Sequence, residues 1–365
     1  MLFSFKQKSQ DFIVEEELPF KLRGKGDALF VYFEKRNLTT MDIITFLCQR
    51  FNISRLTLGI AWLKDKDAVT RQRISIYKTA LAKLGGEHAF LNALAEKTKI
   101  IKTDRHDNPI GMSSDIINTF FIRLRANKKL SLTERKDTDR IITELFATGV
   151  PNVFGNQRFG IEERNRKMGK DILDGKLKIH EKFEAKFKLQ AYASRLFNEY
   201  VVVRTRKEPE LLDGDILRSD YHDKLGIHKK PYTYNKKNNT LQEIKVKDTG
   251  KNALRYPKPV GEAIPYTEDI NAQATWPVIG YNLLTPTASS EAGQQETKFL
   301  ESHGINKTKL EAFQAHKIFG IRRKIWMQPL KTKHHFDGDD LVIKFSLGAG
   351  EYASVLIDSL LKQLG

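Results

Sequence analysis

Residues 59–76 read GIAWLKDKDAVTRQRISI and carry the most unusual charge pattern of the chain. Asp65 lies between Lys64 and Lys66, in a loop that is expected to lead into a strand. Two flanking ammonium groups favour the ionised form of a carboxylate, and an ionised aspartate can act as a nucleophile or a general base. A charged turn that only faces water has the same composition. The pattern alone leaves both interpretations open.

A second stretch, residues 149–160, reads GVPNVFGNQRFG. Its glycines allow tight turns or close approach to a ligand, and an exposed aromatic side chain in such a loop can stack on a nucleobase. Two of the glycines have the spacing of a phosphate-binding loop. However, Ile161 and Glu162 follow where lysine and serine or threonine are required, which rejects nucleoside triphosphate binding. A structural loop with a buried aromatic residue is the alternative.

The third stretch, residues 345–354, reads FSLGAGEYAS and predicts a strand, a tight loop and a helix. Such a helix start can hold an anion or serve packing alone. Before it, we expect a strand pair formed by 324–328 and 341–345. A cluster near the intervening turn could suggest a metal site, but it lacks a recognised ligand spacing, and aspartate and glycine are typical of turns. Its members are His334, His335, Asp337, Asp339 and Asp340.

The net charge is +17, from 62 Lys+Arg against 45 Asp+Glu. This excess indicates a polyanionic partner, with nucleic acid first; a basic but otherwise ordinary enzyme is the alternative. One polar region, 228–251, is rich in lysines interleaved with Tyr232 and Tyr234. It could supply phosphate contacts or form a solvated loop. Its lysines are Lys229, Lys230, Lys236, Lys237, Lys245, Lys247 and Lys251.

A length of 365 residues is enough for two domains. Apolar runs stop far short of the ~20 residues of a membrane span, and residues 1–10 lack a secretory signal pattern. The single cysteine, Cys48, fits a reducing, cytoplasmic compartment. Periodicity predicts strands over 11–15, 28–34 and 116–125, and helices over 40–51, 133–148, 183–203, 296–319 and 352–361.

Two of these stretches together resemble a known family. The core Lys64-Asp65-x-x-Ala68-Val69-Thr70-x-Gln72 is similar to the catalytic motif of the TruD family of pseudouridine synthases, and 152–160 resembles its second signature. Weaker similarity covers most of the chain outside about 217–270. The resemblance implies an α+β fold, with a catalytic domain on a mixed, mainly antiparallel sheet with flanking helices, interrupted by an α+β insertion (TRUD) domain. The expected boundaries are 1–177 with 320–365, and 178–319.

The resemblance also implies a reaction and a site. It assigns the essential carboxylate to Asp65, a base-stacking role to Phe154, a hydrogen-bonding role to Asn152, and a charge-offsetting role to Lys6. The implied substrate is uridine 13 of tRNA, which must leave its stack to reach the carboxylate. No cofactor or metal is expected. Further RNA contacts are expected from Lys64, Arg71, Arg158, Lys229, Lys230, Lys236 and Lys237.

Other functions remain open on the sequence. A binding-only RNA chaperone would keep the fold and lose catalysis, and a glycosylase would release free uracil. The absence of a metal cluster in the sequence disfavours a nuclease. Additional RNA targets are possible within the resemblance. We expect no membrane association, and a monomer, because no long apolar stretch is left over for an interface.

Overall fold

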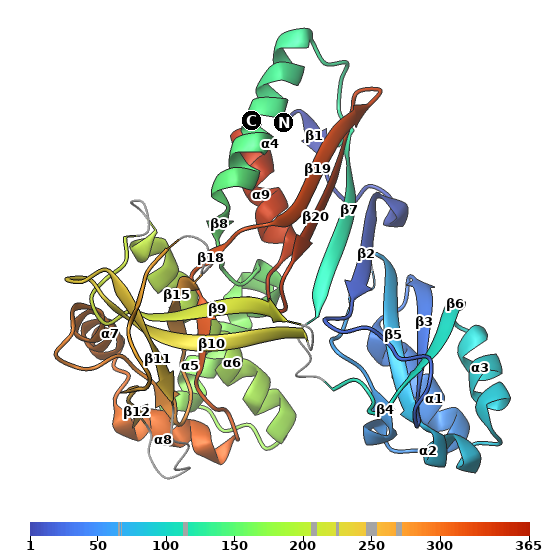
Figure 1. The fold of residues 1–365 in the computed structure, drawn as a ribbon, viewed down its shortest axis with the longest axis horizontal. Coiled ribbons are helices and arrows are strands. Elements are labelled where there is room, and N and C mark those ends of the chain that lie inside the picture. The colour runs from blue at the N-terminus through green and yellow to red at the C-terminus, as the bar shows by residue number, and fades with distance from the viewer. Residues whose placement is uncertain are drawn as a thin grey trace.

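The computed structural model describes residues 1–64, 66, 68–111, 116–205, 210–223, 226–245, 254–267 and 272–365. Two sheets organise this part of the chain (Figure 1). The larger has the order β19-β20-β7-β2-β5-β3-β6, with β1 paired to β7 and β4 paired to β5. Its strands are β1 (Phe3–Ser4), β2 (Phe12–Glu17), β3 (Ala28–Arg36), β4 (Leu58–Gly59), β5 (Val69–Tyr77), β6 (Lys99–His106), β7 (Ile117–Ala126), β19 (Leu330–Asp337) and β20 (Asp340–Leu347).

Strand direction and coverage in this sheet agree with the predicted fold class. β2 and β5 run parallel, and the other pairings in the sheet are antiparallel. The sheet is therefore mixed and mainly antiparallel, as predicted. Its helices are α1 (Thr40–Phe51), α2 (Lys78–Lys83), α3 (Glu87–Ala95), α4 (Leu132–Thr148) and α9 (Ala353–Gln363).

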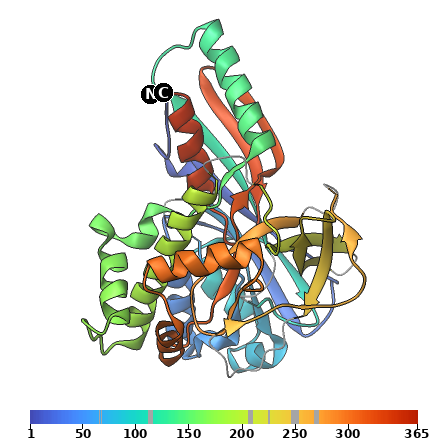
Figure 2. The ribbon, with the colours of Figure 1, turned by 90° about the vertical axis from the view of Figure 1, so that its left-hand side faces the viewer.

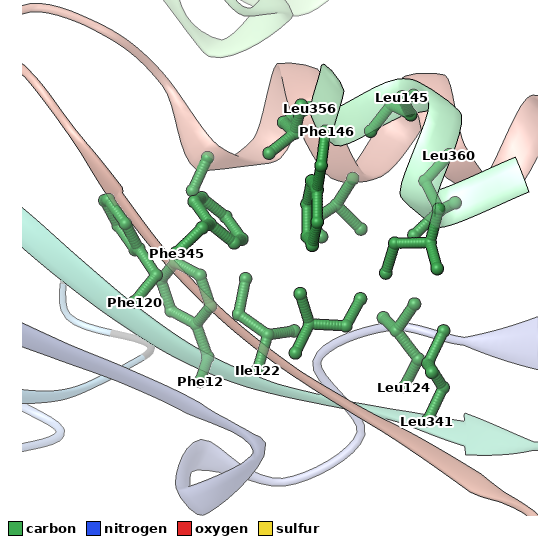
Figure 3. Close-up of a cluster of buried hydrophobic side chains, with 14 of the residues drawn as sticks. Phe12, Phe120, Ile122, Leu124, Leu145, Phe146, Leu341, Phe345, Leu356 and Leu360 are labelled. Carbon is green, nitrogen blue, oxygen red and sulfur yellow. The ribbon is translucent and has the colours of Figure 1, made fainter. Parts of the chain in front are cut away.

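Two apolar clusters bury the helices against opposite halves of the sheet. At one half, aromatic residues of β2, β7 and β20 meet leucines of α4 and α9 (Figure 3). At the other half, β3 and β5 meet α1 and α3. Removing such apolar surface from water stabilises the fold by about 25 cal/mol per Å². Between the two clusters the covered face carries polar side chains, which is where the site lies.

The second sheet belongs to a separate unit, seen at the left of Figure 1 and again in Figure 2. Its strand order is β13-β11-β10-β9-β15-β17, with β14 beside β11. The long helix α6 packs against it on β15. The elements are α5 (Arg164–Leu173), α6 (Lys182–Arg204), β9 (Ile216–Asp223), β10 (Gly226–Asn235), β11 (Thr240–Lys245), β13 (Lys258–Pro259), β14 (Ile264–Pro265), β15 (Ala272–Val278), α7 (Glu291–Ser302), α8 (Lys307–Ala315) and β17 (Ile321–Lys324).

Short strand pairs complete the description. β8 (Val150–Pro151) pairs with β18 (Trp326–Met327), and β12 (Leu254–Arg255) pairs with β16 (Leu283–Leu284). Within the part of the chain that the structure describes, no helix is both long and apolar enough to cross a membrane.

Most predicted elements are confirmed, and two are corrected. The expected helix over 296–319 is two helices, α7 and α8, because the chain turns at Gly304 with a positive φ. The strand that pairs with β20 is β19, not 324–328. Alternate residues of β19 face solvent and are mostly polar, so it lacks the apolar signal that 324–328 carries. That segment instead divides between β17, beside β15, and β18, beside β8.

Candidate active site

A buried polar cluster occupies the middle of the large sheet's covered face. Glu16 on β2 is directly opposite Asn118 on β7. The Lys64 Nζ atom lies 3.7 Å from the Glu16 carboxylate and donates a hydrogen bond to the Asn118 side chain. Only 7 % of the Lys64 side chain and 1 % of the Glu16 side chain are exposed. Burial raises the pKa of Glu16, while Lys64 and Arg73 act in the opposite direction.

Hydrogen bonds of Thr40 also fix the backbone of Lys64 beside this cluster. The Thr40 hydroxyl accepts a hydrogen bond from the Lys64 N–H (2.9 Å) and donates to Gln72 Oε1 (3.0 Å). Thr40 is the first residue of α1, and Gln72 lies on β5, so a helix start and a strand fix the loop from two sides. Among the residues that the structure describes, the buried Gln72 Nε2 atom has no hydrogen-bond partner. An orphaned donor of this kind is uncommon and leaves an N–H group available to an acceptor.

The aspartate of the first motif, Asp65, lies outside the described residues. Its neighbours are described: Lys64 is held as above, and the Lys66 carbonyl accepts from the Ala68 N–H at 2.9 Å. The structure therefore places Lys64, the residue before the predicted catalytic position, in the polar cluster. The role of Asp65 stays a prediction.

A second cluster forms around Asn152, which is 3 % exposed. Its Oδ1 accepts from Arg323 Nη2 at 2.5 Å, and its Nδ2 donates to the Lys324 carbonyl at 2.9 Å. A guanidinium only donates and a carbonyl only accepts, so the orientation of the amide follows from its partners. One N–H of the Asn152 amide remains for another acceptor.

Aromatic rings surround the same guanidinium. The Arg323 Cζ atom lies 4.1 Å from the ring centroid of Phe154, 5.4 Å from that of Phe197 and 5.6 Å from that of Tyr352. The loop that carries Phe154 is fixed by α6, because Asn198 accepts from the Phe154 N–H (2.7 Å) and donates to the Phe154 carbonyl (2.9 Å). The Phe154 ring is half-buried, so part of it reaches the surface.

The two clusters lie at the same end of the large sheet. Asn118 pairs with Leu347, the last residue of β20. The loop that follows brings the Gly350 carbonyl to Arg323 Nη1 at 2.6 Å. The third motif of the sequence therefore connects the Lys64 cluster to the Asn152 cluster. The contacts that this motif makes with Arg323 are the Gly350 carbonyl and the Tyr352 ring.

Two arginines in this region have no carboxylate partner within the described part of the chain. Burial lowers the pKa of Arg323 to about 10, which Tyr352 and Glu351 offset only in part. Burial also lowers the pKa of Arg158, whose Nε donates to the Ser194 hydroxyl at 3.3 Å. Uncompensated positive charge beside aromatic rings makes this a suitable place for an anionic ligand.

The structure also describes two other predicted residues, Lys6 and Arg71. Lys6 has a positive φ of 58° and places its ammonium 4.3 Å from the ring centroid of Phe12. Arg71 alternates with Thr70 and Gln72 on β5 and therefore faces the opposite side of the sheet. There it pairs with Glu34 at 3.1 Å and with Glu15 at 3.9 Å.

The basic run is described only in part. Lys236 pairs with Glu210 at 2.8 Å, and Lys237 is exposed. The side chains of Lys229 and Lys230, on β10, and all of Lys247 and Lys251 lie outside the described residues. Contacts of this run with RNA stay a prediction.

Four of the five His and Asp side chains considered for a metal site form ion pairs with nearby residues. His334 pairs with Asp139, Arg123 pairs with Asp337 and Asp340, and Arg135 pairs with Asp339. Among the residues that the structure describes, no group of three or more His, Cys, Asp or Glu side chains is arranged to hold a metal ion.

Sequence reasoning missed the position of Arg323 in the Asn152 cluster. The weaker similarity covered this residue, but no chemistry was attached to it. Two consecutive arginines, Arg322 and Arg323, were the available signal. The neighbouring sequence does not show that Arg323 contacts Asn152, which lies 171 positions earlier in the chain. Glu16 was missed for the same reason, since a glutamate within a run of three gives no sign of burial.

The architecture described above is shared with a solved structure. A solved structure titled as the putative tRNA pseudouridine synthase D (TruD) from Methanosarcina mazei matches with a TM-score of 0.59 and 20 % identity, over 99 % of this chain and 93 % of that chain. At this identity the likeness shows a shared fold: an α+β sheet domain joined to a second α+β unit.

The family model described as tRNA pseudouridine synthase D (TruD) matches residues 3–186 and 180–360. The chain therefore belongs to the TruD family of tRNA pseudouridine synthases. A relative of that name from Campylobacter jejuni (strain 81-176) is 29 % identical over 98 % of this chain and 92 % of its own length. Another from Wolinella succinogenes is 36 % identical over 56 % of this chain, and this match spans about half (54 %) of that relative.

Proposed function

We propose that this protein isomerises uridine 13 of tRNA to pseudouridine without a cofactor or metal. The reaction breaks the C1′–N1 glycosidic bond, rotates the uracil and forms a C1′–C5 bond, while C5 loses a proton and N1 gains one. Atoms and charge balance without a co-reactant. The observation that carries the proposal is the meeting of the Lys64 cluster and the Asn152–Phe154 cluster at one end of the sheet.

Asp65 is proposed as the catalytic carboxylate. It follows Lys64, whose ammonium is held by Glu16 and Asn118. The carboxylate acts either as a nucleophile at C1′ or as a base on the ribose C2′ proton. Deuterium at C2′ of the target uridine separates these roles, because only proton removal gives a primary isotope effect on turnover.

Phe154 and Asn152 are proposed to hold the flipped uracil. A half-buried ring can stack on the base, which is worth about 1–3 kcal/mol and offsets part of the unstacking cost. The remaining N–H of Asn152 suits an acceptor, such as a uracil carbonyl or the Asp65 carboxylate. Lys6 is proposed to offset the charge of Asp65, and the lysines of 228–251 to contact phosphates.

We propose a monomer as the working unit and the cytoplasm as its compartment. The division into 1–177 with 320–365 and 178–319 also remains our proposal. On this division α5 and β17 belong to the catalytic domain but pack with the second unit, α5 on α6 and β17 beside β15, so Arg323 on β17 lies at the junction of the two units.

The test is incubation of purified protein with unmodified tRNA transcript, without metal or nucleotide. Pseudouridine is mapped by carbodiimide labelling and primer extension. We expect one new stop at uridine 13, absent in Asp65→Ala and in the isosteric Asp65→Asn, with turnover reduced by roughly 10³-fold or more. Asp137→Asn, an exposed aspartate on α4, is the matched control and should retain full turnover.

Other outcomes assign other functions. Binding of tRNA with every uridine left intact would favour a non-catalytic RNA-binding protein, or a different RNA as substrate. Release of free uracil would indicate a glycosylase. Wild-type activity in Asp65→Asn would remove Asp65 from the mechanism.

A further inference from the structure

Aromatic rings and arginines alternate from the candidate site onto the surface of the second unit. The Arg323 Cζ atom lies 4.1 Å from the ring centroid of Phe154, and the Arg158 Cζ atom lies 5.9 Å from the same centroid. The same Arg158 guanidinium is 5.5 Å from the ring centroid of Phe187 on α6. Phe183 stands one helical turn before Phe187, so the two side chains are neighbours on the helix surface. We call Phe154, Arg158, Phe187 and Phe183 the aromatic track.

The outer end of the track is unusually exposed for its chemistry. Phe183 is 76 % exposed, and Phe187 is half-buried. Ile161, in the loop after the second motif, is 88 % exposed. Single exposed apolar residues need no explanation. Here, however, they continue a row of rings that begins at the candidate base-stacking residue.

The charges around the track favour an anion over an apolar protein partner. Within the described residues, several cations near Phe183 form no ion pair with a carboxylate. The nearest acidic side chains are engaged: Glu181 accepts from backbone N–H groups at the start of α6, and Glu184 pairs with Lys188 at 3.6 Å. The unpaired cations are Arg158, Lys176, Lys178, Lys182 and Lys186.

We propose that the aromatic track binds the unpaired RNA nucleotides next to the target uridine. Bases stack on Phe183 and Phe187, and a phosphate lies against Arg158. Rings accept any base face, while cations follow the backbone, and this combination is what single-stranded RNA requires. The proposal rests on the proposed function for its choice of substrate and extends it by a second contact region beyond the flipped uridine.

The experiment measures tRNA binding directly, so it does not depend on turnover. Equilibrium dissociation constants for unmodified tRNA are compared for wild type, Phe183→Ala, Phe183→Leu and Phe183→Trp. Because the side chain is exposed, these variants should fold normally, which thermal unfolding verifies. We expect Phe183→Ala to bind about 5- to 20-fold more weakly. Phe183→Trp should restore binding, and Phe183→Leu should not. Leu132→Ala, an 80 % exposed apolar residue at the start of α4, is the control that should bind as wild type.

Stacking has its own signature. A 2-aminopurine placed beside the target uridine should lose fluorescence on binding wild type and regain it with Phe183→Ala. Arg158→Met should instead reduce the salt dependence of binding, by a slope of about 0.7–0.9 for one lost phosphate contact.

The outcomes separate the inference from the proposed function. Unchanged tRNA affinity in Phe183→Ala overturns the track, even if the protein modifies uridine 13. Equal binding by Phe183→Leu and wild type also overturns it, because apolar contact would then suffice. A change of oligomeric state in Phe183→Ala, measured by light scattering, without a change in RNA affinity would assign the surface to a second copy of the chain. A wild type that binds through the track but leaves uridine unchanged would retain the track and reject the proposed reaction.

Discussion

Lys64, whose side chain is buried, and Arg323, which is half-buried, are both cations of the candidate site, but they are held in different ways. Lys64 faces the Glu16 carboxylate at 3.7 Å and the Asn118 amide. Arg323 faces the carbonyl oxygens of Asn152 and Gly350, the Asn152 side chain and three aromatic rings. No carboxylate pairs with Arg323 in the part of the chain that the structure describes.

The different partners of Lys64 and Arg323 suit the two residues to different functions. An ion pair balances its own charge, so the Lys64 cluster fixes a loop while adding little net field. A cation held by neutral groups keeps its positive potential in a place of low dielectric constant. We infer that the first arrangement positions the predicted catalytic loop, and that the second attracts the RNA backbone while it orients Asn152 and Phe154.

Breaking the second arrangement should have the largest effect. Arg323→Met removes the donors to Asn152 and Gly350 and leaves buried oxygens without partners. We expect turnover to fall by roughly 10²- to 10³-fold and the free energy of unfolding to fall by about 2–4 kcal/mol. Single-turnover assays and urea unfolding measure both. Arg323→Lys keeps the charge but not the planar fork, so it should recover stability more than turnover. Full activity in Arg323→Met would contradict the assigned role.

Breaking the first arrangement should affect chemistry more than stability. Glu16→Gln keeps the shape of the side chain and removes the charge opposite Lys64. We expect kcat to fall about tenfold with tRNA affinity unchanged. The free energy of unfolding should change by less than about 1 kcal/mol, because a buried carboxylate is itself costly.

The pH dependence of stability gives a further check on Glu16. Burial raises its folded-state pKa above the ordinary 4.5. A raised pKa contributes stability that is present below pH 4.5 and lost as the pH rises through the folded value. The melting temperature of wild type relative to Glu16→Gln should therefore be highest at acidic pH. The opposite trend would show that the ion pair outweighs burial.

The smallest effect is expected at a partly solvated ion pair outside the candidate site, which serves as a reference for the Arg323 and Glu16 variants. Asp174, after α5, accepts from Lys170 and from Lys309 of α8 (2.5 Å for Lys309). These bonds lower the pKa of Asp174 to about 2 from 3.8. A lowered pKa contributes stability above pH 3.8 that is lost as the pH falls through about 2. Asp174→Asn should cost at most about 1 kcal/mol at pH 7, and calorimetry should show this difference vanish near pH 2.

Local patterns predicted much of the fold. Thr39 caps α1 by accepting from the Asp42 N–H, as a threonine before an apolar helical stripe indicates. The helix predicted over 133–148 is α4, and it ends at Gly149, which has a positive φ. The failures lie where partners are distant: β6 was not predicted, and β19 was assigned to the wrong segment. Strand pairing depends on the neighbouring strand that offers a complementary face, and the sequence of one strand does not specify that neighbour.

The sequence by itself determined the chemistry that is available: a lysine-flanked aspartate, an asparagine and a phenylalanine in a glycine-rich loop, and a large positive charge. Each signal is carried by residue type and short spacing. Only the tertiary structure decided how these groups are used. In the folded chain the Asn152 Oδ1 atom accepts a hydrogen bond from Arg323, Lys64 pairs with Glu16, and Arg71 lies on the opposite face of the sheet, where it pairs with Glu34. The physical reason is that burial and partnership depend on contacts between segments far apart in the chain, which residue type and short spacing do not specify.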